Sequence, residues 1–140
     1  MSPSCALAYV FGSIVRIYSG DADRGIEWAE RALQLSPFDP MVYGPLLSIG
    51  LGRLQRGEYE AAAEAAQRLF QANPYWSLAH VALAGTHAKL GRLDAARSAA
   101  ARVLELQPGF TIKGLCTSFD LHPSLAAPLS EALAEAGLPA

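Results

Sequence analysis

Cysteine is scarce in this sequence, and its two cysteines are far apart. Cys5 and Cys116 lie near opposite ends of the 140-residue chain. A disulfide framework or a zinc knuckle needs cysteines or histidines at close, recurring spacings, and the sequence has none. We therefore expect no disulfide, no bound metal and no cofactor, and we expect the reducing environment of the cytoplasm.

Concentrated positive charge is also missing. The net charge is only −2, and no block of Lys or Arg occurs anywhere along the chain. Nucleic acids and anionic membranes attract proteins through such blocks, and a membrane span needs about 18 or more consecutive apolar residues, which the sequence lacks. The apolar run 5–15 has no basic segment before it, so it is interpreted as a helix and not as a signal peptide. We expect neither a nucleic-acid nor a membrane partner.

What the sequence has in excess is apolar side chains. Hydrophobic residues make up 51% of the chain, and the mean hydropathy is +0.19. A chain of this length fits one domain that buries its own core without disulfides or a bound metal. The surplus indicates apolar surface that contacts a partner.

Glycine and proline recur at a fixed spacing. Three glycines are each followed 17 residues later by a proline, in the pairs Gly20–Pro37, Gly57–Pro74 and Gly91–Pro108. The glycines are 37 and 34 residues apart, which indicates a 34-residue period with an insertion at residues 40–42. Periods of this length are typical of solenoids built from pairs of helices.

Each unit follows the same order: helix, glycine turn, helix, proline. Glycine tolerates the turn conformation, and proline ends the second helix. Apolar residues at helical spacing follow the second and third glycines. These stripes are Tyr59, Ala62, Ala63, Ala66, Leu69 and Phe70 in unit two, on the same helical face as Glu58, and Leu93, Ala96, Ala100, Val103 and Leu104 in unit three.

The segments Leu90–Ala96 and Leu104–Pro108 resemble a tetratricopeptide (TPR) repeat. The resemblance implies an all-α solenoid of helical hairpins, with three repeats at residues 6–39, 43–76 and 77–110 in a right-handed superhelix. The small residues that the family uses for close helix packing are matched at Gly25, Gly50, Ala62, Ala84 and Ala96.

Some positions depart from the family pattern. Unit one has Gly12 and Ser13 where Leu-Gly is usual, and unit three has His80 and His87 where aromatic residues are usual. The two histidines are seven residues apart, whereas paired metal ligands on a helix prefer a spacing of four. We expect both histidines to pack in the core.

Residues 111–140 lie beyond the repeats. Residues 111–119 lack periodicity and are predicted to be an irregular linker or one short turn. From Pro123 onward, an apolar stripe that ends at Gly137 predicts a helix that caps the C-terminal end of the solenoid. Pro128 would cost about 3 kcal/mol inside a helix, which predicts a kink or a later start.

The tail suggests a narrower resemblance. Pro108–Ile112 and Ala136–Pro139 resemble the C-terminal TPR region of bacterial class III adenylate and guanylate cyclases. This implies a non-catalytic regulatory part of a larger signalling protein, because the cyclase metal-binding and nucleotide-binding segments are absent from the sequence. The apolar, uncapped first helix also leads us to expect a preceding segment.

The TPR resemblance implies that the first helix of each unit lines a concave, partner-binding side. Nearly all of these positions are apolar, and of the Lys, Asn and Arg residues that clamp a C-terminal carboxylate only Lys89 is present. The sequence therefore predicts a groove for an apolar helix or strand of a partner, or a face covered by a neighbouring domain, the terminal helix or a second copy. The predicted residues are Leu7, Val10, Ile14, Ile17, Tyr18, Leu47, Leu51, Leu54, Gln55, Leu78, Val81, Gly85 and Lys89.

No arrangement of residues suggests catalysis. Cys116 has no base nearby in sequence, and no paired carboxylates or phosphate loop stand out. Tyr75 and Trp76 are expected to wedge adjacent units or to form an exposed hot spot, and Trp28 to pack between hairpins. We therefore expect a protein-interaction module or, alternatively, a homodimerisation device, and no enzyme.

Overall fold

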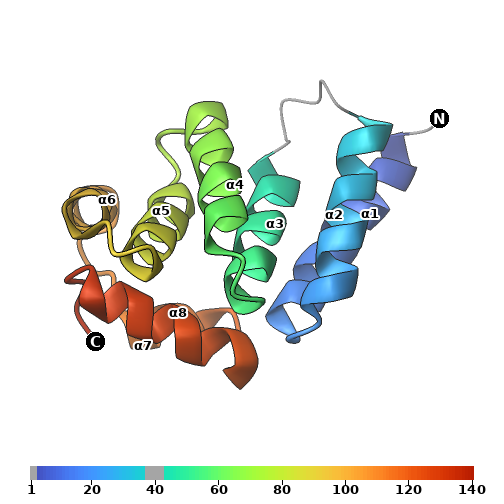
Figure 1. The fold of residues 1–140 in the computed structure, drawn as a ribbon. Coiled ribbons are helices and arrows are strands. Elements are labelled where there is room, and N and C mark those ends of the chain that lie inside the picture. Colours follow the sequence, from blue (N-terminus) through green and yellow to red (C-terminus); the bar gives the residue numbers. More distant parts are fainter. Residues whose placement is uncertain (1–2, 37–42) are drawn as a thin grey trace.

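The computed structural model describes residues 3–36 and 43–140, with side chains from residue 6 onward. These residues form eight α-helices and no β-strand, arranged as successive hairpins (Figure 1). The chain is therefore all-α, as predicted. The helices are α1 (Pro3–Tyr18), α2 (Ala22–Leu35), α3 (Tyr43–Gln55), α4 (Tyr59–Ala72), α5 (Ser77–Lys89), α6 (Leu93–Leu106), α7 (Ile112–Ser118) and α8 (Pro123–Glu135).

The three repeating glycines occupy equivalent turns. Gly20, Gly57 and Gly91 have φ angles of +88°, +79° and +75°, in the left-handed region that side chains disfavour. The N–H of each glycine donates to the carbonyl three residues before it, at 3.1 Å in all three turns. The glycine turn between paired helices is thus confirmed in the α1–α2, α3–α4 and α5–α6 hairpins.

The predicted proline stops fit the helix ends where the structure describes them. α4 ends at Ala72 and α6 at Leu106, in each case two residues before the proline. Pro37 and the insertion at residues 40–42 lie outside the described residues. The start of α2 is capped by the Asp21 side chain, which accepts the N–H of Arg24 at 3.2 Å.

Small residues let the first hairpin pack tightly. The ring of Trp28 lies against the backbone at Gly12, and the side chain of Ile17 lies against Gly25. Gly52 of α3 in turn faces Ile17 and Ile26. A Cβ at any of these glycines would collide with a neighbouring side chain, so the helix spacing depends on them.

The C-terminal part differs from the prediction at residues 112–118. Residues 112–118 form α7, whose first turn is capped by the Thr111 hydroxyl accepting the N–H of Gly114 at 3.0 Å, so the predicted irregular linker is wrong there. α8 begins at Pro123 and continues through Pro128. Pro128 cannot donate the backbone hydrogen bond that would go to the carbonyl of Ser124, so the helix continues with one hydrogen bond fewer.

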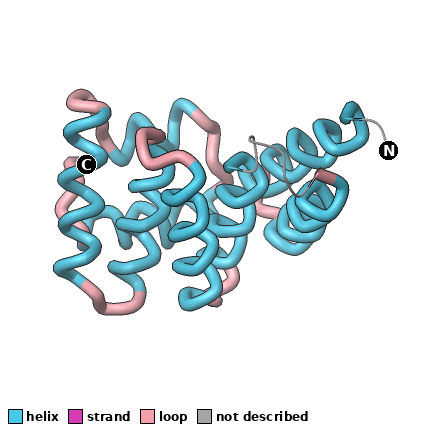
Figure 2. The backbone as a smooth tube through the Cα atoms, turned by 90° about the horizontal axis from the view of Figure 1, so that it is seen from above, coloured by secondary structure: helices cyan, strands magenta, loops and turns pink. Residues whose placement is uncertain are grey.

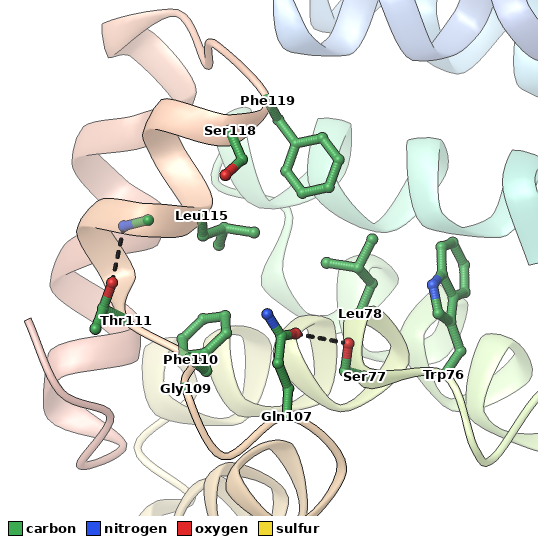
Figure 3. Close-up of a pocket in the computed structure, with 11 residues that line it drawn as sticks. Trp76, Ser77, Leu78, Gln107, Gly109, Phe110, Thr111, Leu115, Ser118 and Phe119 are labelled. Atoms are coloured by element: carbon green, nitrogen blue, oxygen red, sulfur yellow. Dashed lines mark hydrogen bonds between the residues drawn. The ribbon is translucent and has the colours of Figure 1, made fainter.

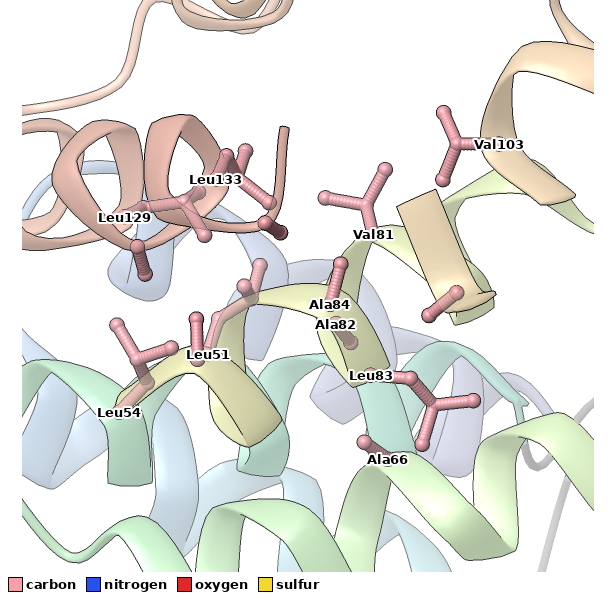
Figure 4. Close-up of a cluster of buried hydrophobic side chains, with 14 of the residues drawn as sticks. Leu51, Leu54, Ala66, Val81, Ala82, Leu83, Ala84, Val103, Leu129 and Leu133 are labelled. Carbon is pink, nitrogen blue, oxygen red and sulfur yellow. The ribbon is translucent and has the colours of Figure 1, made fainter. Parts of the chain in front are cut away.

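α8 lies along the inner side of α3 and α5 and does not cap α6 in the manner of a further repeat (Figures 1 and 4). Leu125, Leu129 and Leu133 of α8 are fully buried in this contact. The N-terminal end of α8 reaches the first hairpin, where the N–H of His122 donates to the Tyr18 carbonyl at 2.8 Å. The segment from His122 to the end of α8 therefore contacts helices of all three repeats (Figure 1), and Figure 2 shows the row of helices from above.

Candidate protein-binding surfaces

Most of the residues predicted for the concave side do gather on the inner side of the solenoid, but there they contact α7 and α8. Leu7 is exposed, and Val10, Ile14, Tyr18, Gln55, Leu78 and Lys89 are half-buried. Six of the predicted residues are buried: Ile17, Leu47, Leu51, Leu54, Val81 and Gly85.

The space between this face and the C-terminal helices is nearly filled. A residual cavity of about 10 Å³ lies between Leu47, Leu51 and Val81 on one side and Leu115 and Leu129 on the other. A cavity of that size holds about one water molecule at most. With α8 in place, a partner helix or strand has no room in this groove, and its use as a binding site stays a prediction.

The two polar residues among the predicted positions hold α8 at its margins. Lys89 Nζ donates to Glu131 Oε1 at 3.1 Å. Gln55 Nε2 donates to the Gly20 carbonyl at 2.8 Å and to Ser124 Oγ at 3.3 Å. Glu131 is 65% exposed, so its ion pair is worth only about 0.2–1 kcal/mol. The apolar contacts are therefore what keep α8 in place.

A different apolar surface is open on α1. Leu7, Phe11 and Val15 are 47%, 63% and 62% exposed. They are four residues apart, so they form one row along the helix, here called the α1 row. Residues 3–15 contain no charged side chain. Of the row, only Leu7 was among the predicted positions, although the spacing of Phe11 and Val15 was visible in the sequence.

A hollow of about 470 Å³ lies beside the α1 row. It is lined by Phe11, Val15, Arg16, Asp21 and Trp28, together with Gly12 and Ser19. The Arg16 guanidinium stacks 4.8 Å from the centre of a Trp28 ring. Exposed aromatic and arginine side chains next to apolar residues are typical of the centre of protein interfaces.

Of the aromatic residues singled out in the sequence, Trp28 lies differently from the prediction. Trp28 packs within the first hairpin, edge-on to Tyr9 of α1 at 5.9 Å between ring centres, and not between hairpins. Trp76 packs edge-on against Tyr43 at 5.2 Å. Tyr75 is 76% exposed. It lies in the turn between α4 and α5, far in sequence from the α1 row, and serves as a control position.

Two hollows flank α7. One, of about 410 Å³, lies between the start of α5, the α6–α7 turn and α7, with Ser77 donating to Gln107 Oε1 at 3.1 Å on its wall (Figure 3). The other is an apolar groove of about 610 Å³ between α7 and α8, here called the α7–α8 groove. Its lining residues are Ile112, Lys113, Cys116, Thr117, Leu121, Pro123, Ala126, Ala127, Ser130, Ala134 and Ala140.

In the sequence, His80, His87 and Cys116 were possible metal ligands or a possible catalytic thiol. His80 is buried edge-on to Phe70, and its Nε2 lies 2.8 Å from the Pro74 carbonyl. Burial, and to a lesser extent the charge of Arg92, lowers the pKa of His87. Cys116 Sγ lies 3.4 Å from Ser130 Oγ. Within the described residues, no group of three or more His, Cys, Asp or Glu side chains could hold a metal, and no helix is long and apolar enough to cross a bilayer.

Part of the chain matches a known repeat family, and its fold is similar to that of solved structures. Residues 53–117, just under half of the chain, match the family model described as tetratricopeptide repeat. Among solved structures 28 chains match, including MamA AMB-1 in a P212121 crystal form, with a TM-score of 0.59 and 24% identity over 91% of this chain and 67% of that chain. No curated protein sequence matches. The chain is therefore an all-α protein with the successive helical hairpins of the tetratricopeptide-repeat fold.

Proposed function

We propose that the chain is a protein-interaction scaffold and that its docking surface is the α1 row. One observation carries this proposal. Of the six large hydrophobic side chains exposed among the described residues, three form this single uncharged row. Singly scattered apolar residues are normal on a protein surface, whereas a contiguous apolar patch marks an interaction site.

The energetics favour an interface larger than the row itself. Burying three large apolar side chains contributes about 1.5–3 kcal/mol each, which is comparable to the 4–15 kcal/mol that association costs. The adjoining hollow supplies further contacts through Trp28 and Arg16. The row and the hollow together form the anchor of the proposed interface.

A matched pair of surface variants tests this role. Phe11→Lys places a charge in the row, and Tyr75→Lys places the same charge at an exposed aromatic residue far from it in sequence. In pull-downs from the source cells, we expect proteins retained by the parent chain to be lost with Phe11→Lys and kept with Tyr75→Lys. Equal retention by both variants would contradict the proposal.

The inner face remains a second candidate site, either for a partner helix or for homodimerisation. The observation in its favour is α8 itself, whose Leu125, Leu129 and Leu133 show that this face accepts a helix with leucines at every fourth position. Binding there requires α8 to leave. Hydrogen exchange tests this: amides of α8 must exchange at a free energy well below that of global unfolding. If they exchange only with the core, this candidate fails.

Attachment to a nucleotide cyclase, a bacterial signalling role and a cytoplasmic location are predictions from the sequence alone.

A further inference from the structure

The α1 row occupies the repeat-stacking face of its helix. Leu7, Phe11 and Val15 precede Gly20 by 13, 9 and 5 residues. Counting back in the same way from Gly57 and from Gly91 identifies the equivalent residues. They are Gly44, Ser48 and Gly52 in α3, and Leu78, Ala82 and Thr86 in α5.

In α3 these equivalent positions contact the preceding hairpin. A Cβ at Gly44 would lie 3.2 Å from Val10, Ser48 shares a hydrogen bond of 3.1 Å with Ser13, and Gly52 faces Ile17 and Ile26. In α5, Ala82 and Thr86 are buried, and Leu78 is half-buried and lines the inner cavity. The row on α1 therefore continues an established interface whose other side is open.

The side chains at the equivalent positions are small in α3 but large in α1. At the inner interface, α3 contributes Gly, Ser and Gly, and the larger side chains come from the hairpin before it. α1 contributes Leu, Phe and Val instead. An ordinary repeat hairpin stacked at the same distance would collide with these side chains. The matching surface must be an apolar recess with small side chains.

The same chain carries such a recess in the α7–α8 groove. Ala126, Ser130 and Ala134 line it along α8 at the four-residue spacing of the row, so each row extends about 12 Å. The groove has one charged lining residue, Lys113, and the row has none. With a net charge of only −2, repulsion between copies is weak.

We propose that copies of this chain associate head to tail, with the α1 row of one copy seated in the α7–α8 groove of the next. The inference rests on the proposed function, because it names the partner of the α1 row. A contact between two different faces leaves one of each free, so association continues beyond a dimer.

Light scattering coupled to size exclusion, over a range of protein concentrations, tests the proposal with two blocked variants. Phe11→Lys blocks the row, and Ala127→Arg blocks the groove at an exposed position. We expect the parent mass to rise past that of a dimer. Each variant alone is expected to be a monomer, with the circular dichroism and Tm of the parent.

The decisive sample is the equimolar mixture of the two variants. Each retains the face that the other has lost, so the mixture is expected to form a dimer and to stop there. A parent that is monomeric at every concentration overturns the inference, as does a dimer unaffected by Ala127→Arg, or a mixture that stays monomeric while the parent associates. The pull-down comparison of Phe11→Lys with Tyr75→Lys judges the proposed function independently, because a monomeric parent can still bind another protein.

Discussion

Gly85 of α5 lies directly against Leu129 of α8: a Cβ built at Gly85 would stand 3.3 Å from Leu129 Cδ1 and 3.4 Å from Leu54 Cδ1. Glycine at this point lets one leucine of α8 approach the backbone of α5 between the first helices of two repeats (Figure 4). This contact covers the inner face. Burial of Leu129 is therefore expected to stabilise the packing of α8 against the repeats.

Leu129→Ala is expected to lower the free energy of unfolding by about 2–5 kcal/mol, because a fully buried leucine leaves a cavity when truncated. Urea denaturation followed by circular dichroism measures the change. Leu93→Ala is the matched control: Leu93 is 40% exposed, so its loss should be much smaller. Equal effects of the two changes would show that α8 does not pack against the inner face.

Gly25→Ala is expected to destabilise the first hairpin even though alanine favours helix more than glycine does. A Cβ at Gly25 meets the Ile17 side chain, and overpacking of this kind costs about 1–3 kcal/mol, against about 0.5–1 kcal/mol gained in helix propensity. Gly109→Ala, where nothing lies within 4 Å, serves as the control. Thermal unfolding of both variants gives the comparison, and a rise in Tm for Gly25→Ala would refute the close contact.

Gly57→Ala separates backbone strain from packing. Gly57 has φ +79° and open space around its Cα, so the substitution costs about 1–2 kcal/mol through conformation alone. Gly57→Asn is expected to cost less, because asparagine tolerates left-handed geometry better than alanine. Chemical denaturation ranks the two, and the reverse order would contradict the turn described here.

The stability of the protein should depend on His87 at mildly acidic pH. Since burial and Arg92 lower the pKa of His87 in the folded state, the unfolded chain binds more protons near the ordinary histidine value of about 6.5. The free energy of unfolding therefore falls as the pH drops through this range. His87→Gln should show a shallower decline between pH 7 and 5 in denaturation curves. Parallel curves would exclude His87 as the cause.

Local sequence signals predicted the hairpins well. The glycines at positions 20, 57 and 91 specify turns because their left-handed φ angles depend on the residue itself and not on distant contacts. The apolar stripes likewise predicted the second helices, whose inward residues, such as Ala62 and Ala96, are fully buried. The short helix at residues 112–118 was missed because two turns carry too little periodicity to be recognised.

The sequence by itself therefore determined the repeat period, the all-α class and the positions of the three glycine turns, since these depend on residues close together in the chain. Only the tertiary structure decided which apolar faces meet. The inner face and the α1 row are both apolar in sequence, and they differ because Leu125, Leu129 and Leu133 reach one of them and nothing described reaches the other. Burial of an apolar stripe is a property of the pair of surfaces that meet, and composition and spacing report only one member of the pair.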